Sequence, residues 1–349
     1  MTDYQSLRRL LDPFRAALYD FDGTTARVEL ARAAAPDALF RLAHPFGDTI
    51  GANAYHDHAI APLARAMPDL ERRDWIVMAG PDQAGADWIG CGGTYTGTFV
   101  APFLDIPPTG HIAHMRFHEF FRVDHGKIVE MQALWDIPEL MMQASAWPMA
   151  PSLGREMRVP GPATQDGLMT GPRDAAQSDA TCQHIINMLT AMKRHPSQGG
   201  PDVMELPKYW HERFMWYGTA GIGSGRGVSG FRNWHQIPFL NGMPDRGLYV
   251  DEITYHFFGD SNYAAVTGWP NMLQSITHDG WMGISPPGGR VEMRSLDFWR
   301  LEQGRIRENW VLVDLLHLYD QIGVDVLARM REVNKALPTG PIPIAGEVV

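Results

Sequence analysis

The chain repeats itself, and this internal repeat limits its fold more than any other feature of the sequence. Residues 120–143 (FFRVDHGKIVEMQALWDIPELMMQ) resemble residues 298–321 (FWRLEQGRIRENWVLVDLLHLYDQ) at one constant offset of 178 positions. Upstream, the tripeptide MPD occurs at residues 67–69 and again at residues 243–245. Chance matches would not keep the same spacing over so many positions, so the sequence predicts two copies of one domain.

The composition of the segments around the two copies indicates the domain boundaries. A chain of 349 residues is long enough for two domains that each bury a core. The segment between the copies is rich in Pro and Gly, which is typical of a semi-extended linker, and the C-terminal segment is similar. We therefore predict a first domain over residues 1–147, a linker over 148–180, a second domain over 181–335 and a Pro-rich arm over 336–349.

Charge and composition exclude several classes of protein. The net charge is -10, and no block of Lys and Arg offsets it, which argues against a nucleic-acid or anionic-membrane partner. No run approaches the roughly 18 apolar residues that a membrane helix needs, and no secretory signal follows Met1. Only Cys91 and Cys182 are present, too few for a disulfide framework or a thiolate metal site. We expect a cytoplasmic protein without a metal or cofactor.

One stretch is similar to a motif from an unrelated class of enzyme. Residues 18–26 (LYDFDGTTA) look like the nucleophile loop of haloacid dehalogenase-like phosphatases, which follows a buried strand. Here the apolar residues before the loop have helical spacing instead. The later FFGDSN at residues 257–262, which imitates a metal-binding motif, lies 178 positions after a turn of the first copy. We therefore reject a phosphotransferase.

Each copy begins with helical periodicity and ends in strands. This order predicts α+β domains in which helices cover one face of an antiparallel sheet. In the first copy the helical part spans residues 5–67, and the strands are expected at 74–78, 88–98, 111–123 and 128–135. In the second copy the helical part spans residues 181–242, and the strands are expected at 249–258, 264–273, 291–301 and 305–314.

Both copies carry the same succession of short motifs. A PPTG or PPGG turn is followed by a hairpin with GKI or GRI and a Glu, then by an Asp and a short helix with Leu and Gln. This order resembles the C-terminal signature of the SnoaL-like polyketide cyclases, within the nuclear transport factor 2-like superfamily. The resemblance implies two tandem, cone-shaped α+β barrels, each a curved antiparallel sheet whose helices enclose a pocket. Because single-domain relatives pair through their sheets, it also implies an internal pseudo-dimer of the two halves, which as a whole can form a homo-oligomer.

The resemblance also implies a type of chemistry. A cofactor-free cyclase joins an enolisable carbon to a carbonyl, which requires a base of raised pKa and a donor for the developing oxyanion. In the family, the working pair is a His on the penultimate strand and an Asp on the last strand. Those positions hold Glu119 and Ala133 in the first copy, and Asp297 and Val311 in the second. The family's Asp is absent from both copies, and we expect Glu119 or Asp297 to act as base.

Three further residues are catalytic candidates. Asp136 and Asp314 occupy the Asp of the repeated motif, where the alternative role is a helix cap. His118 lies on the strand face opposite to that of Glu119, and its surroundings depend on the register of the hairpin. A bulge at the hairpin turn would bring His118 opposite Gln132, whereas a two-residue turn would bring Glu119 opposite Gln132. Both registers remain open at this point.

Aromatic residues are concentrated in the second copy. Two segments, YWHERFMWYG at residues 209–218 and FRNWHQ at 231–236, combine Trp with His. Aromatic walls suit a planar ligand, and the alternative is an ordinary aromatic core. We therefore favour the second copy for the working pocket and expect this pocket to be lined by Trp210, His211, Trp216, Trp234, His235, Trp299 and Trp310.

Two functions follow from these features. The first is a SnoaL-like polyketide cyclase or a related acid/base enzyme, which carries out an aldol cyclisation or isomerisation on a small hydrophobic carbonyl compound. The alternative is a non-catalytic protein of the same fold that binds such a ligand. Acidic residues on apolar strand faces favour the enzyme, whereas the missing family Asp favours the binding protein.

Overall fold

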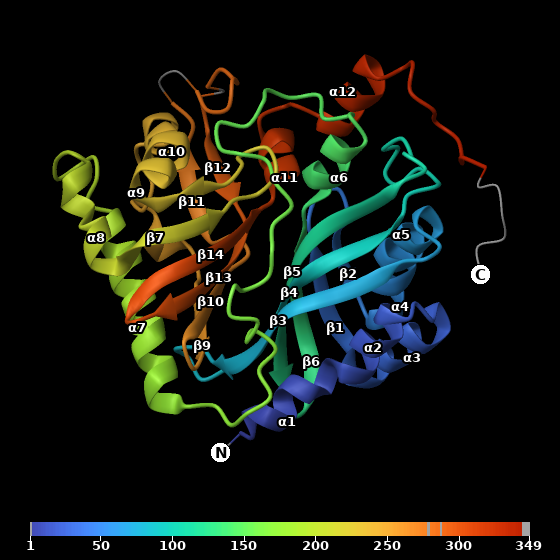
Figure 1. Cartoon of the computed structure of the whole chain (residues 1–349), viewed down its shortest axis with the longest axis horizontal. Coiled ribbons are helices and arrows are strands. Elements are labelled where there is room, and N and C mark those ends of the chain that lie inside the picture. The colour runs from blue at the N-terminus through green and yellow to red at the C-terminus, as the bar shows by residue number, and fades with distance from the viewer. Residues whose placement is uncertain (1, 278–279, 287, 344–349) are drawn as a thin grey trace.

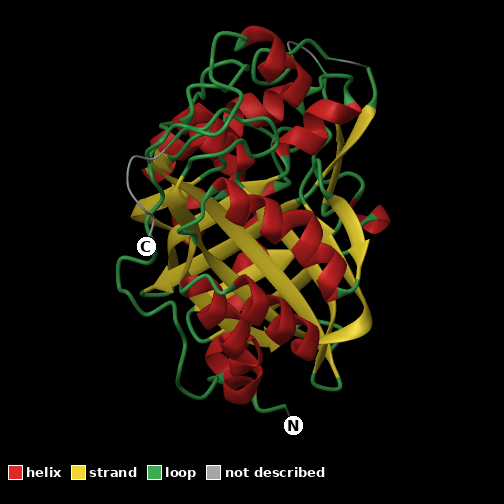
Figure 2. Cartoon of the chain, turned by 90° about the vertical axis from the view of Figure 1, so that its right-hand side faces the viewer, coloured by secondary structure: helices red, strands yellow, loops and turns green. Residues whose placement is uncertain are grey.

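The structure is a computed structural model that describes residues 2–277, 280–286 and 288–343. The two copies form two units of similar architecture, and their sheets pack against each other in the middle of the molecule (Figure 1). Most helices lie on the outer side of each sheet, whereas the C-terminal helices of both units lie at the upper end of the view in Figure 1, near the middle of the molecule. Figure 2, viewed from the side of the first unit, shows helices in front of the strands.

The first unit comprises the elements up to residue 143. Its helical segments are α1 Tyr4–Arg8, η1 Arg9–Leu11, α2 Asp12–Tyr19, α3 Gly23–Ala33, α4 Ala52–Tyr55, η2 His56–Ile60, α5 Ala61–Ala66 and α6 Ile137–Gln143. Its strands are β1 Ala34–Leu42, β2 Gly47–Ile50, β3 Glu71–Pro81, β4 Asp87–Thr98, β5 Ile112–Asp124 and β6 Lys127–Trp135.

The second unit comprises the elements from residue 175 to residue 333. Its helical segments are α7 Ala175–Met192, η3 Pro201–Met204, α8 Leu206–Tyr209, α9 Gly227–Phe231, η4 Arg232–Gln236, α10 Ile237–Gly242, η5 Val250–Glu252, α11 Leu315–Gln321 and α12 Val326–Val333. Its strands are β7 Trp210–Tyr217, β8 Gly225–Arg226, β9 His256–Asp260, β10 Tyr263–Thr267, β11 Met272–Ser275, β12 Arg290–Met293, β13 Ser295–Glu302 and β14 Arg305–Val313.

Each unit contains a six-stranded sheet, and the two strand orders correspond. The first order is β2-β1-β6-β5-β4-β3 and the second is β8-β7-β14-β13-β10-β9, while β11 and β12 pair separately. Both sheets are open, and the predicted α+β class with helices on one face is confirmed. The prediction of a wholly antiparallel sheet is wrong in one respect, because β1 and β7 run parallel to β6 and β14.

The register of the terminal hairpins differs from both expectations. In each unit a two-residue turn, with Gly126 or Gly304 at positive φ, is followed by a one-residue bulge. The combination places Glu119 directly opposite Ala133, and not opposite Gln132. The second unit has the same register, so Asp297 lies opposite Val311. The positions that the family resemblance pairs are therefore direct neighbours across the strands.

The two sheets enclose an apolar core of their own. Its aromatic centre includes Phe120 of the first unit and Phe298 of the second, whose ring centroids are 4.9 Å apart. The linker passes between the units (Figure 1), where the carbonyl of Gly167 accepts a hydrogen bond of 2.8 Å from the N–H of Val77 on β3. The chain segment between the copies is thus part of the packing between the units.

The C-terminal segment returns to the first unit. The N–H of Ile342 donates a hydrogen bond of 2.8 Å to the carbonyl of Val100, just after β4. The end of the predicted arm, residues 344–349, lies outside the described residues.

Candidate active site in the second unit

Glu119 of the first unit is fully buried, and its neighbours neutralise it. The guanidinium of Arg72 forms an ion pair of 2.6 Å with Oε2 of Glu119. The hydroxyl of Tyr95 and the indole N–H of Trp135 both donate to Oε1 at 3.0 Å. Arg72 also pairs with Asp74 at 3.0 Å. A carboxylate with three donors around it retains little capacity to act on a ligand.

His118 points away from the interior of the first unit and toward the second. Its Nδ1 atom lies 2.6 Å from the carbonyl oxygen of Leu296 on β13. Burial and the nearby charge of Arg116 hold the pKa of His118 well below its ordinary value, so the ring is neutral. The structure therefore places His118 between the two sheets, apart from Glu119.

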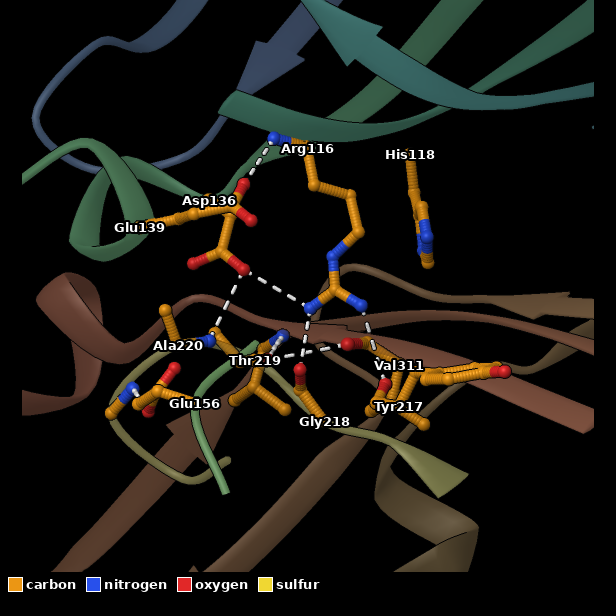
Figure 3. A network of polar contacts seen from close by, with 12 residues as sticks. Arg116, His118, Asp136, Glu139, Glu156, Tyr217, Gly218, Thr219, Ala220 and Val311 are labelled. Atoms are coloured by element: carbon orange, nitrogen blue, oxygen red, sulfur yellow. Dashed lines mark hydrogen bonds and ion pairs between the residues drawn. The ribbon is translucent and has the colours of Figure 1, made fainter. Parts of the chain in front are cut away.

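The two motif aspartates connect the units. Asp136 accepts hydrogen bonds from Arg116 at 3.0 Å and from the N–H of Ala220 at 3.1 Å (Figure 3). Asp314, its counterpart, accepts a bond of 3.0 Å from the N–H of His44 in the first unit. Burial raises the pKa of Asp136 to about 7, and the charge of Arg116 opposes this shift. Both aspartates thus bind the backbone of the opposite unit, and Asp314 also caps α11.

A cavity of about 90 Å³ lies inside the second unit. The strands β7, β13 and β14 contribute to one wall, and the helical segments α7, α9, η4 and α10 contribute to the others. Aromatic and aliphatic side chains make up most of the lining, which is typical of sites for hydrophobic ligands. The polar side chains at the cavity are His235, Gln236, Arg246, Ser295, Asp297 and Asn309.

Asp297 is the acidic group of this cavity. Its Oδ1 atom is buried and, within the described ranges, has no hydrogen-bond partner. Burial raises the pKa of Asp297 to about 8, against the opposing effects of the Ser295 hydroxyl and the Arg246 charge. A carboxyl group with this pKa can take up and release a proton near neutral pH.

The raised pKa of Asp297 also predicts how the unfolding free energy depends on pH. The folded protein holds the Asp297 proton up to a pH of about 8, whereas the unfolded chain releases it near the ordinary value of 3.8. The unfolding free energy contributed by this group is therefore present below that ordinary value and is lost as the pH rises through about 8. We expect Asp297→Asn to flatten the pH dependence in this window, measured by urea unfolding at several pH values. An unchanged pH dependence would contradict the raised pKa.

Other buried polar atoms around the cavity also lack partners among the residues that the structure describes. Both amide atoms of Gln236, which is 2% exposed, and Nδ1 of His235 are in this state, as are the indole nitrogens of Trp210 and Trp299. Burial lowers the pKa of His235 to about 3, so its ring is neutral. Buried polar groups in folded proteins almost always have partners. Their concentration here indicates a site for a ligand with polar groups.

Of the seven predicted pocket residues, four line the cavity of Asp297 and three lie elsewhere. Trp234 is 54% exposed and lines a neighbouring cavity of about 140 Å³, which shares His235 with the first. His211 lies outside both, and its ring accepts a hydrogen bond from a backbone N–H two residues on. Trp310 faces the opposite side of the sheet, in the core between the units. The four predicted residues that do line the cavity are Trp210, Trp216, His235 and Trp299.

Sequence reasoning missed four polar residues that line the cavity, namely Gln236, Arg246, Ser295 and Asn309. A signal for Arg246 was present in the repeat. Arg246 directly follows the second MPD motif, whereas Leu70 directly follows the first. A cation in one copy at the position of an apolar residue in the other points to a function of one copy only.

Two further searches of the described part of the chain gave negative results. Within it, no group of three or more His, Cys, Asp and Glu side chains is arranged to hold a metal ion. No described helix combines the length and the apolar character needed to cross a membrane.

The chain was compared with known proteins. TsrD from Streptomyces laurentii is 22% identical over 41% of this chain and 98% of its own, with a TM-score of 0.34. IdmH from Streptomyces antibioticus, a candidate polyketide cyclase, is 20% identical over 40% of this chain and 98% of its own, with a TM-score of 0.33. No curated protein sequence matches. The model of the SnoaL-like polyketide cyclase family matches residues 16–144 and 199–322. Because these two segments make up more than half of the chain, the protein belongs to the SnoaL-like polyketide cyclase family.

Proposed function

We propose that the second unit is the active half of a cofactor-independent acid/base enzyme, and that Asp297 is its catalytic residue. The observation that carries this proposal is the unpartnered Oδ1 atom of Asp297, buried at an apolar cavity. Family membership supports a hydrophobic carbonyl compound as the substrate class. The first unit supports the second structurally, because the equivalent acid, Glu119, is held by Arg72.

The proposed reaction starts with proton transfer. The ionised Asp297 removes a proton from a carbon next to a carbonyl group, and the electrons of the broken C–H bond form an enolate. The amide N–H of Gln236, which has no partner in the described structure, donates a hydrogen bond to the enolate oxygen. The enolate carbon then attacks a second carbonyl of the same molecule, and Asp297 returns its proton to the alkoxide. In an isomerisation, the proton returns to a different carbon instead.

The apolar walls of the cavity contribute to this chemistry in two ways. They keep the pKa of Asp297 high enough for the carboxylate to be an effective base. They also offer the flat surfaces of aromatic rings to a planar ligand. Two of these rings, Trp216 and His235, stack on each other with their centroids 4.0 Å apart. At about 90 Å³ the inner cavity is smaller than a typical ligand site of roughly 300–1,000 Å³. A larger substrate would extend into the neighbouring cavity that shares His235.

The test is proton exchange on a simple probe. 2-Tetralone is a bicyclic ketone with one aromatic ring and enolisable carbons, and the loss of its α-protons in D2O is measured by NMR. We expect kcat/KM for exchange to rise with pH and to level off above about 8, because only the ionised Asp297 is a base. A rate that falls over this range would instead assign Asp297 the role of an acid.

The alternative is a protein of the same fold that binds the ligand without transforming it. One observation favours it: Asp297 lies opposite Val311, where the family resemblance implies a second acidic residue. In this case 2-tetralone would quench the fluorescence of the tryptophans at the cavity, while its α-protons would exchange no faster than in buffer. This result would overturn the enzymatic proposal.

The arrangement of the units supports a further part of the proposal. Asp136 and Asp314, which occupy equivalent positions, each bind a backbone N–H of the opposite unit. The acceptor and donor positions correspond in the repeat, since Ala220 follows His44 by 176 positions, as the second MPD follows the first. We therefore propose that the two units take the places of two subunits in single-domain relatives.

A further inference from the structure

Arg246 brings a positive charge to the wall of the cavity. It lines the cavity of Asp297 and also a smaller space of about 30 Å³, which Lys193 lines as well. Its guanidinium carbon lies 5.7 Å from the centroid of the Phe239 ring. Within residues 2–277, 280–286 and 288–343, no acidic side chain forms an ion pair with this guanidinium and no acceptor binds it.

Arg246 is partly buried, and its lack of an ion pair sets it apart from the fully buried arginines of the same protein. Arg8, Arg72, Arg116 and Arg300 each have a carboxylate within 3.0 Å. Charges that are partly removed from water are usually paired in proteins. Burial lowers the pKa of Arg246, and nearby Tyr255 and Asp297 oppose this shift.

Neighbouring charges do not supply the missing partner. Lys193 is a second cation, whose pKa burial and the charge of Arg246 lower, while the charge of Asp251 acts on Lys193 in the opposite direction. Asp297 is the acid whose charge acts on Arg246, but its raised pKa of about 8 leaves it largely neutral at pH 7. The cavity therefore has a positive end in a protein whose net charge is -10. An anionic group of a ligand would compensate this charge.

We infer that Arg246 binds a carboxylate of the ligand, so that the substrate is an acid with a hydrophobic ring system and an enolisable carbonyl. A guanidinium is suited to this task because it can donate two parallel hydrogen bonds to one carboxylate. The inference rests on the proposed function for the carbonyl part of the substrate, but the carboxylate site stands on Arg246 alone. The first unit has Leu70 at this position, which restricts the site to the second unit.

A matched pair of probes tests the inference. 2-Naphthoate and 2-naphthamide have the same ring and nearly the same shape, and only the first is charged. Binding is measured by isothermal titration at pH 6, where Asp297 is protonated and does not repel the anion. We expect the protein to prefer 2-naphthoate by roughly tenfold or more, as for a charge-assisted hydrogen bond.

Substitutions assign this preference to one residue. Arg246→Gln should remove the preference and leave the affinity for 2-naphthamide unchanged, and Arg246→Lys should retain part of it. Arg158→Gln is the matched control, because Arg158 is an exposed arginine on the linker, away from the cavity, and its loss should leave the preference intact. Equal affinities in the unmodified protein, or a preference that survives Arg246→Gln, would overturn the inference.

The proposed function and this inference can fail separately. 2-Tetralone itself has no carboxylate, so its exchange reports on Asp297 without Arg246. If exchange is absent while Arg246→Gln removes the preference for 2-naphthoate, the enzymatic proposal is wrong and the carboxylate site stands. If exchange occurs and the protein shows no preference for 2-naphthoate, the enzymatic proposal stands and the carboxylate site is wrong.

Discussion

Replacing Asp297 by Asn is expected to lower kcat/KM for α-proton exchange of 2-tetralone by at least about a hundredfold, the usual contribution of a general base. Asn has nearly the same shape as Asp, so the cavity remains intact, but its amide cannot take up the proton. The Oδ1 atom of Asp297 has no hydrogen-bond partner in the described structure, so the substitution breaks no internal ion pair at this atom. The affinity for 2-tetralone, followed by tryptophan fluorescence, should therefore change little.

The first unit supplies the matched control for this experiment. Glu119 is the positional equivalent of Asp297, but Arg72, Tyr95 and Trp135 already occupy its carboxylate. We expect Glu119→Gln to leave the exchange rate unchanged at a temperature where the variant is folded. Loss of exchange in Glu119→Gln, with full activity in Asp297→Asn, would move the active site to the first unit. If neither variant loses exchange activity, neither acid takes part in the mechanism.

The sequence was sufficient to predict the features that depend on local patterns and on the repeat. The two strands of each terminal hairpin follow from the alternation of apolar and polar residues. The constant offset between the copies correctly predicts two units of the same fold. Alternation also placed Glu119 and Asp297 on apolar strand faces, where the structure has them. The different surroundings of the two acids could not be predicted, because Arg72 reaches Glu119 from a strand 47 positions away.

The strands that pair in parallel were missed for a physical reason. Residues of β1 (AAPDALFRL) include good helix formers, and their extended conformation depends on pairing with β6, a distant segment. One local signal was available, since Pro36 disfavours a helical conformation of the residue before it. The bulge after the hairpin turn was likewise unpredictable, because residues on either side of Gly126 fit both registers. Arg246 lies in a loop between α10 and η5, where no periodicity reveals the direction of its side chain.

The ion pair that neutralises Glu119 leads to the second large effect. Arg72→Met is expected to lower the unfolding free energy by roughly 3–5 kcal/mol, because it leaves a buried carboxylate without its counter-charge. Arg72 is 1% exposed and also pairs with Asp74, while Met preserves most of its packing against Phe117, whose ring lies 4.1 Å away. The measurement is urea unfolding of the unmodified protein and the variant at pH 7, followed by circular dichroism.

A double substitution separates the ion pair from simple packing. In Arg72→Met/Glu119→Gln both charges are absent, the amide oxygen of Gln can still accept from Tyr95 and Trp135, and Asp74 retains its second ion pair of 2.9 Å with Arg15. The double variant should therefore be more stable than Arg72→Met alone, since no unpaired Glu119 carboxylate remains in the core. If the double variant is less stable than the single one, the loss comes from packing and the assigned role of Arg72 is wrong. Recovery of stability would mean that the first unit holds its acid for structure, in contrast to Asp297, whose Oδ1 atom has no partner in the described structure.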